Sequence, residues 1–296
     1  PLIFGWSLCV EKQVFHPTEY LHLIDGWITH GDENFDKERA LKLKRFIESD
    51  FLAYVKETYA SIEAVNQSWG TRYTAWDDIR PAPNVPDETS MHNYDTQRYR
   101  QWVGERWVRR QVEAIRRVDP NHLIGCGIVQ RNNPLVRQKA HAEITDSPAT
   151  YGALEVPKIA QFLDFLDPHF YPITFREPEK EMEWLKAYLR YCYVGKPLIL
   201  GEFGHGDKEI MAEWNRLNVE SSIGLVSGWM PWALHNTKGM GDHVTRVSGL
   251  VEDDFKTETE WGTVFKTLKR ELMLDSREGI ARSPDDTTVF KLDMKK

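Results

Sequence analysis

The chain has 296 residues, of which 41% are hydrophobic and 12% aromatic, and its formal net charge at pH 7 is -7. A chain of this length can bury one large α/β domain or most of a (β/α)8 barrel, which commonly takes about 250 residues. The acidic balance excludes nucleic acid and anionic membrane as partners, since it attracts neither, and no apolar run reaches the roughly 18 residues that span a bilayer.

The first predicted element is an apolar run at residues 2–10, which is typical of a buried strand. Two long helical patterns follow, at 36–58 and 91–118, with a short helix at 61–69 and no convincing strand between them. We interpret residues 34–118 as a helical insertion after the first strand.

From residue 120 onward, predicted strands alternate with predicted helices. The strands are the apolar runs at 122–129, within 162–172, at 197–203 and at 225–234. Near-continuous apolar runs are typical of parallel strands that are covered on both faces. Apolar positions at helical spacing predict three helices, carrying in turn Met182, Leu185, Tyr188, Leu189 and Cys192; Ile210, Met211, Trp214 and Leu217; and Trp261, Val264, Phe265 and Leu268.

This order of elements predicts an α/β fold, the C-terminal portion of a TIM (β/α)8 barrel with about five strands present. The barrel portion would cover residues 1–272, and residues 273–296 would form a tail. Five strands cannot close a barrel of eight, and the open strand edges would need partners. We therefore expect a fragment whose remaining strands come from a missing N-terminal barrel half or from a second chain.

Two glutamates each follow an apolar strand at its carboxyl end. Glu11 follows the run at 2–10, and Glu202 ends the run at 197–203. Catalytic groups of a barrel gather at this end of the strands, and hydrolysis of a glycosidic bond with retention needs two carboxyl groups about 5 to 5.5 Å apart. We therefore predict Glu11 and Glu202 as a catalytic pair. The simpler alternatives are a surface position beside Lys12 for Glu11 and a rim ion pair for Glu202.

Both glutamates lie in motifs that resemble clan A glycoside hydrolases. The sequence GWSLCVE at 5–11 resembles the fourth strand of that clan, and GKPLILGEFG at 195–204 resembles the seventh. The resemblance implies that Glu11 is the acid/base and Glu202 the nucleophile. The clan usually has Asn directly before the acid/base, where this chain has Val10.

Three further segments extend the resemblance to particular families. The sequence DFLDPHFYP at 164–172 is similar to the sixth strand of family-five cellulases and mannanases, and GWMPWAL at 228–234 is similar to the eighth. Residues 51–79 resemble the helical insertion of family-42 β-galactosidases, which also follows the fourth strand.

Several residues near the predicted strand ends are candidates for sugar contacts. His169 and Tyr171 are two positions apart and so share one face of a strand. The resemblance implies that Tyr171 orients the nucleophile and that Trp232 forms a platform under the sugar. Each has a simpler alternative: His169 could be a capped histidine at the rim, and Trp232 an ordinary core ring. His205 and His235 could be solvated loop histidines. The predicted substrate-binding residues are His169, Tyr171, Trp232, His205, His235, Gln130 and Trp229.

The combined sequence evidence predicts a retaining glycoside hydrolase of β-linked sugars, either a β-glycosidase or an endo-β-glycanase acting on mannan, glucan or a galactoside. The expected partner is carbohydrate, and neither a cofactor nor a metal is expected, because the histidine spacing matches no metal signature. Two alternatives stay open. A catalytically inactive carbohydrate-binding relative is favoured by Val10, and a half-barrel that completes another chain is favoured by the strand number.

Overall fold

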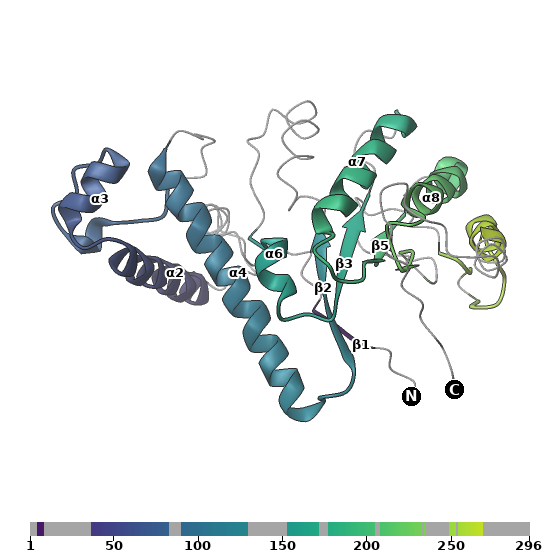
Figure 1. Cartoon of the computed structure of the whole chain (residues 1–296), viewed down its shortest axis with the longest axis horizontal. Helices are drawn as coiled ribbons and strands as arrows, with labels where there is room; N and C mark the ends of the chain where they lie inside the picture. Colours follow the sequence, from purple (N-terminus) through teal and green to yellow (C-terminus); the bar gives the residue numbers. More distant parts are fainter. Residues whose placement is uncertain are drawn as a thin grey trace. The chain divides into compact units, whose positions relative to one another are not determined.

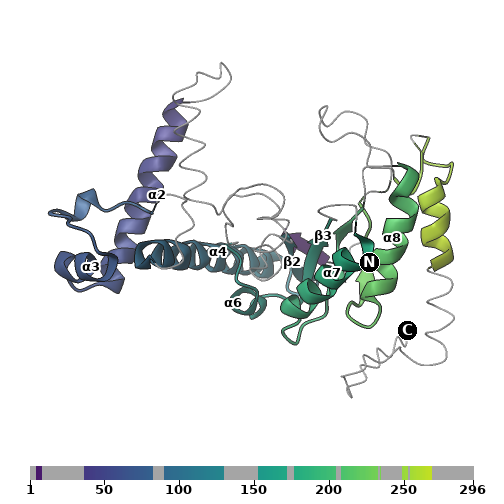
Figure 2. The ribbon, with the colours of Figure 1, turned by 90° about the horizontal axis from the view of Figure 1, so that it is seen from above.

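The computed structural model divides into two compact units, shown in Figures 1 and 2. The strand unit comprises Pro1–Ser7, His122–Gln130 and Leu163–Lys296, and the helical unit comprises Leu8–Asn121 and Arg131–Phe162. The residues described are 5–8, 37–82, 90–129, 153–171, 177–204, 208–232, 234, 249–252 and 254–268.

The five predicted strands are confirmed, and they lie side by side in the order of the sequence. The elements are β1 (Gly5–Leu8), β2 (Leu123–Val129), β3 (Phe165–Phe170), β4 (Ile199–Leu200), β5 (Glu202–Phe203) and β6 (Gly228–Trp229). One sheet has the order β1-β2-β3-β5, while β4 pairs with β6. The pairs β2–β3, β3–β5 and β4–β6 are parallel. Because β4 and β5 are separated by one residue, they form a single interrupted strand.

β6 is shorter than the predicted run at 225–234, because Pro231 follows it closely and has no backbone N–H for a ladder. The residues on either side of this proline still donate to the neighbouring strand. The Met230 N–H donates to the Leu200 carbonyl at 2.9 Å, and the Trp232 N–H donates to the Phe203 carbonyl at 2.9 Å. The path of the strand therefore continues past its two regular residues.

The predicted helices of the strand unit are also confirmed. They are α7 (Pro178–Cys192), α8 (Lys208–Ser222) and a last helix at 260–268, and α8 lies between the other two in both Figure 1 and Figure 2. The apolar positions predicted for α7 are all buried. Parallel strands in sequential order, joined through helices, are the architecture of a TIM barrel, so the strand unit is part of a (β/α)8 barrel.

The helical unit contains α2 (Lys37–Thr58), α3 (Ile62–Trp69) and α4 (Met91–Val118), close to the predicted helices. Two short elements were not predicted, a 3-10 turn η1 (Trp76–Asp78) and α6 (Val156–Ala160). The core of this unit is made of Phe51, Val55, Val65, Trp69, Ile79 and Tyr99. Among the described helices, none is long and apolar enough to cross a membrane.

Candidate active site

One face of β3 carries three polar side chains toward the carboxyl end of the strand. Side chains alternate along a strand, so Asp167, His169 and Tyr171 project from the same face. Asp167 and His169 are buried in the middle of a strand whose residues are all buried. In the pairing of β3 with β5, His169 lies directly opposite Glu202. The register of these two strands therefore places a fourth polar side chain beside the first three.

Glu202 reaches this face because the strand formed by β4 and β5 contains a bulge. Leu166 pairs with Leu198, and His169 pairs with Glu202, so β3 advances by three residues while its partner advances by four. The extra residue changes which face the following side chain occupies. Gly201 lies at this position, and a Cβ on it would be 1.4 Å from Oδ1 of Asp167. The bulge thus requires glycine.

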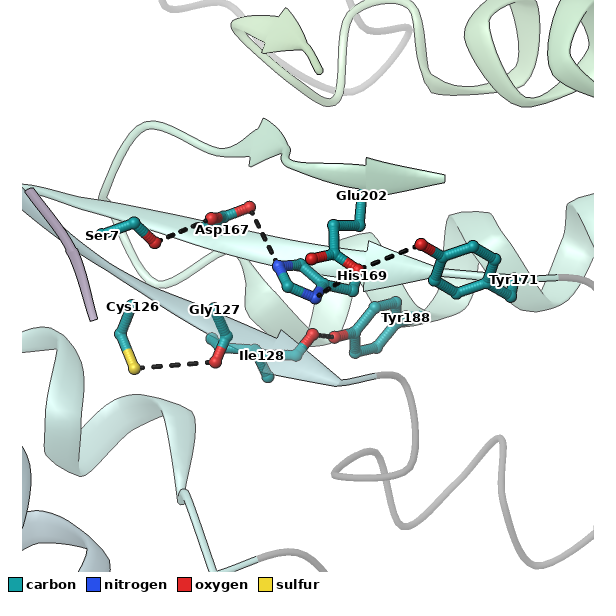
Figure 3. Close-up of polar contacts among 9 residues, drawn as sticks. All are labelled: Ser7, Cys126, Gly127, Ile128, Asp167, His169, Tyr171, Tyr188 and Glu202. Carbon is teal, nitrogen blue, oxygen red and sulfur yellow. Dashed lines mark hydrogen bonds and ion pairs between the residues drawn. The ribbon is translucent and has the colours of Figure 1, made fainter. Parts of the chain in front are cut away.

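The four side chains of this face, with Ser7 of β1, form a continuous series of contacts, drawn in Figure 3. The Tyr171 hydroxyl donates to Oε2 of Glu202 at 3.0 Å. Nδ1 of His169 lies 3.4 Å from the same Oε2, and Nε2 of His169 lies 3.5 Å from Oδ1 of Asp167. The Ser7 hydroxyl donates to Oδ2 of Asp167 at 3.1 Å. The Tyr171 hydroxyl donor, with the His169 ring beside the same oxygen, restricts the orientation of the Glu202 carboxylate.

Tyr188 of α7, also drawn in Figure 3, lies beneath this site and serves packing. Its hydroxyl donates to the Ile128 carbonyl of β2. Burial raises the pKa of the Tyr188 phenol well above its ordinary value, with a smaller contribution from Cys192, and burial likewise raises the pKa of the Cys192 thiol. Both groups are therefore neutral over the range in which enzymes usually work. We therefore interpret Tyr188 and Cys192 as packing residues and assign them no catalytic role.

The two predicted tryptophans differ in their surroundings. Trp229 is half-buried, and its indole Nε1 donates to the Ser222 hydroxyl of α8 at 2.8 Å. Trp232 is 40% exposed, and its backbone N–H donates to the carbonyl of Phe203, the residue after Glu202. Trp232 therefore lies at the carboxyl ends of the strands with an accessible ring, whereas Trp229 is held against a helix.

The structure brings together three of the predicted site residues, Glu202, His169 and Tyr171. Four others, Glu11, Gln130, His205 and His235, fall outside the described residues, as does Val10. No group of His, Cys, Asp and Glu that could hold a metal ion occurs among the residues the structure describes.

Two residues of the contact series, Asp167 and Ser7, were not predicted from the sequence. Asp167 is two positions before His169, and an acidic residue inside an otherwise apolar strand was the available signal. Ser7 had none, because its partner is 160 positions away in the chain.

Comparison with known proteins identifies a family for this chain. The sequence model of glycoside hydrolase family 42, described as beta-galactosidase, matches residues 27–236. A search of curated proteins by sequence returns no match.

Solved structures with the same fold share little sequence identity with this chain. A cold-adapted beta-galactosidase from Rahnella sp. R3 has a TM-score of 0.60 and 14% identity, with 79% of this chain and 34% of that chain covered. A family 42 beta-galactosidase from G. stearothermophilus has a TM-score of 0.59 and 16% identity, with 80% and 35% covered. An agarase has a TM-score of 0.52 and 17% identity, with 77% of this chain and 32% of that chain covered.

The chain thus spans about a third of the length of these solved relatives. The alignments nevertheless cover 77 to 80% of this chain. The family model matches residues 27–236, which is more than half of the 296-residue chain. The chain therefore belongs to glycoside hydrolase family 42.

Proposed function

We propose that this protein is a retaining glycoside hydrolase of β-linked sugars and that β-galactosides are its substrate class. The observation that carries the proposal is Glu202, a carboxylate at the carboxyl end of a parallel strand with the Tyr171 hydroxyl on its Oε2. Membership of a family described as beta-galactosidase supports the substrate class. The beta-galactosidases with the same fold support a barrel glycosidase in general.

In the proposed reaction, Glu202 attacks the anomeric carbon while Glu11 gives a proton to the glycosidic oxygen, so that the aglycone leaves as an alcohol. The sugar is then bound to Glu202 as an ester. In the second step Glu11 takes a proton from water, the water oxygen attacks the anomeric carbon, and Glu202 is released as a carboxylate. Two displacements at one carbon retain the β configuration.

Substrate contacts are proposed for the residues around this pair. Sugar rings present an apolar face that stacks on flat aromatic side chains. The exposed ring of Trp232 is suited to that role. We assign hydroxyl contacts to His205, His235 and Gln130, and a supporting position to Trp229.

The remaining barrel strands come, in this proposal, from sequence that flanks these residues or from a second chain. The strand number and the share of the solved relatives that the chain spans support this. The molar mass of the purified protein in solution shows whether flanking sequence or a second chain is present. A single chain of these 296 residues that is closed and active by itself contradicts the proposal.

The proposed roles are tested with Glu202→Ala and Glu11→Ala in the protein encoded by the complete gene, assayed on aryl β-galactosides. Loss of a nucleophile lowers kcat by about 10⁴-fold or more. Azide can then replace the missing group. The Glu202 variant should yield the α-glycosyl azide, because azide attacks the face opposite the leaving group. The Glu11 variant should yield the β-glycosyl azide, because azide replaces the water that attacks the glycosyl ester in the second step.

The two product configurations, read by proton NMR, separate the two roles. Near wild-type activity in either variant contradicts the assignment. Binding of galactosides by the wild-type protein without turnover would instead favour the catalytically inactive relative, for which Val10 in place of the usual Asn is the discriminating feature. Circular dichroism of each variant shows whether it is folded.

A further inference from the structure

The strand face that holds Glu202 also holds Asp167, an acid that the proposed reaction does not use. Its side chain is 5% exposed. Oδ2 accepts the Ser7 hydroxyl, while Oδ1 is buried and receives no hydrogen bond within the described part of the chain. Nε2 of His169 lies 3.5 Å from Oδ1. A buried carboxylate oxygen is costly unless a donor or a positive charge faces it.

His169 lies between two carboxylates, one at each ring nitrogen. Nδ1 is 3.4 Å from Oε2 of Glu202, and Nε2 is 3.5 Å from Oδ1 of Asp167. A neutral imidazole has one N–H and one lone pair, so one of its nitrogens would direct a lone pair at a carboxylate. An imidazolium has two N–H groups and can direct one at each carboxylate. The His169 side chain is 2% exposed, so bulk water screens these contacts little.

The surroundings fix Asp167 in this position. Ser7 of β1 donates to one oxygen, and the missing side chain of Gly201 leaves room for the other. The titratable groups that face the Asp167–His169–Glu202 series among the described residues are Tyr171, which follows β3, and Tyr188 of α7. Both are phenols, which are neutral at ordinary pH. Among the described residues, Asp167 and Glu202 are therefore the charged groups that contact His169.

We propose that Asp167 is a positioning residue for the glycosidase reaction, which holds His169 as an imidazolium so that Glu202 stays ionised and oriented toward the anomeric carbon. This inference rests on the proposed function. In this proposal His169 interacts with the nucleophile Glu202, whereas the sequence predicted that it contacts the sugar. The series Asp167–His169–Glu202 would carry two negative charges and one positive charge, and the positive charge lies between them.

Asp167→Asn tests the charge while keeping the shape. The amide oxygen can still accept from Ser7, and the amide nitrogen can donate to Nε2, which leaves His169 neutral with its proton on Nδ1. Glu202 then loses a neighbouring positive charge. An opposite charge at this distance changes a carboxyl titration by roughly 1 to 3 pH units. Because the substitution also removes the more distant negative charge of Asp167, the acidic limb of kcat/KM should move to higher pH by at most about that amount.

Ser7→Ala is the matched control, because it removes a hydrogen bond from Asp167 but no charge. Its acidic limb should stay at the wild-type pH. A purely structural role for Asp167 predicts a lower kcat/KM at every pH with the limb unmoved. That result in an active, folded Asp167→Asn protein overturns the inference while leaving the proposed function standing. A wild-type protein with no turnover contradicts the proposed function and, with it, the role of Asp167.

The charge of His169 can be read without an activity assay, in the same complete protein. In protein carrying ¹⁵N-labelled histidine, the side-chain signals lost in His169→Gln identify this ring. The expected result is that both nitrogens remain protonated in the wild type through neutral pH and that Asp167→Asn makes the ring neutral. A neutral His169 ring in the wild type at pH 6 overturns the inference, whether or not the variant folds.

Discussion

At the residue scale, the geometry of the site depends on Gly201, which has no side chain. Gly201 lies between Leu200 and Glu202, where the strand bulges, and the carboxyl group of Asp167 occupies the space in which a Cβ would sit. Any other residue would have to displace a buried carboxylate or the strand. One glycine therefore positions two acidic groups, Asp167 and Glu202.

Gly201→Ala should lower the free energy of unfolding by about 1 to 3 kcal/mol, as overpacking commonly does, and should reduce activity with it. The matched control is Gly228→Ala in β6, where a Cβ would meet nothing within 4 Å. That change should be neutral or slightly stabilising, because it restricts the unfolded chain. Urea denaturation measures both. Equal midpoints for the two variants would show that the space at Gly201 is not needed.

The helical unit shows at the element scale how two long helices are joined by polar contacts beside an aromatic core. Asp50 of α2 accepts hydrogen bonds from Arg106 of α4, at 2.7 and 3.2 Å to its two oxygens, and from the Tyr99 hydroxyl at 2.9 Å. Tyr99 in turn packs edge to face against Phe51, with ring centroids 5.2 Å apart. The carboxylate thus connects α2 to α4 at the margin of the core.

Asp50→Ala should destabilise the helical unit by about 1 to 3 kcal/mol, because it leaves the Tyr99 hydroxyl and the Arg106 guanidinium without their partner. Glu38→Gln is the control within the same helix, since its ion pair with Lys42 is largely exposed to solvent and contributes little. Peptide-level hydrogen exchange over α2 and α4 measures the difference. Equal protection in the two variants would contradict this role for Asp50.

Buried phenol and thiol groups in both units make the stability of the protein depend on alkaline pH. Burial raises the pKa values of Tyr188 and Cys192 in the strand unit and of Tyr99 in the helical unit. In the unfolded chain these groups lose their protons near pH 8.5 for Cys and 10 for Tyr, by approximate reference values. Above those values the unfolded chain binds fewer protons than the folded chain, so stability falls as pH rises.

Thermal unfolding should therefore occur at progressively lower temperature as the pH is raised from about 8.5 to 11. Replacing Tyr188 with Phe removes one of these titrating groups and should flatten the decrease, at the cost of the hydrogen bond to Ile128. A melting temperature that does not change over this range would contradict the buried, neutral state of these groups.

The sequence predicted the elements well because their signals are local. Apolar runs and helical spacing gave the strands and all the longer helices, while α6, with only five residues, is too short to show a helical period. The face of α8 was less predictable. Trp214 is buried as expected, but Leu217 is only partly buried, and the same helix buries Asn215 and Asn218. Burial of an amide depends on neighbouring elements, which periodicity does not record.

The site was predictable in part, for a related reason. Glu202, His169 and Tyr171 could be singled out because strand ends and alternation are visible in the chain. Strict alternation, however, puts Glu202 on the face of Leu198 and Leu200, and only the bulge turns it toward His169.

By itself, then, the sequence determined the α/β class, the order of strands and helices, and the place of Glu202 near a strand end, since each follows from side chains close together in the chain. Only the tertiary structure decided that Asp167, His169 and Glu202 form one series with Ser7. The reason is that the pairing register of three strands, distant in sequence, sets which side chains meet, and a single additional residue in one strand changes that outcome.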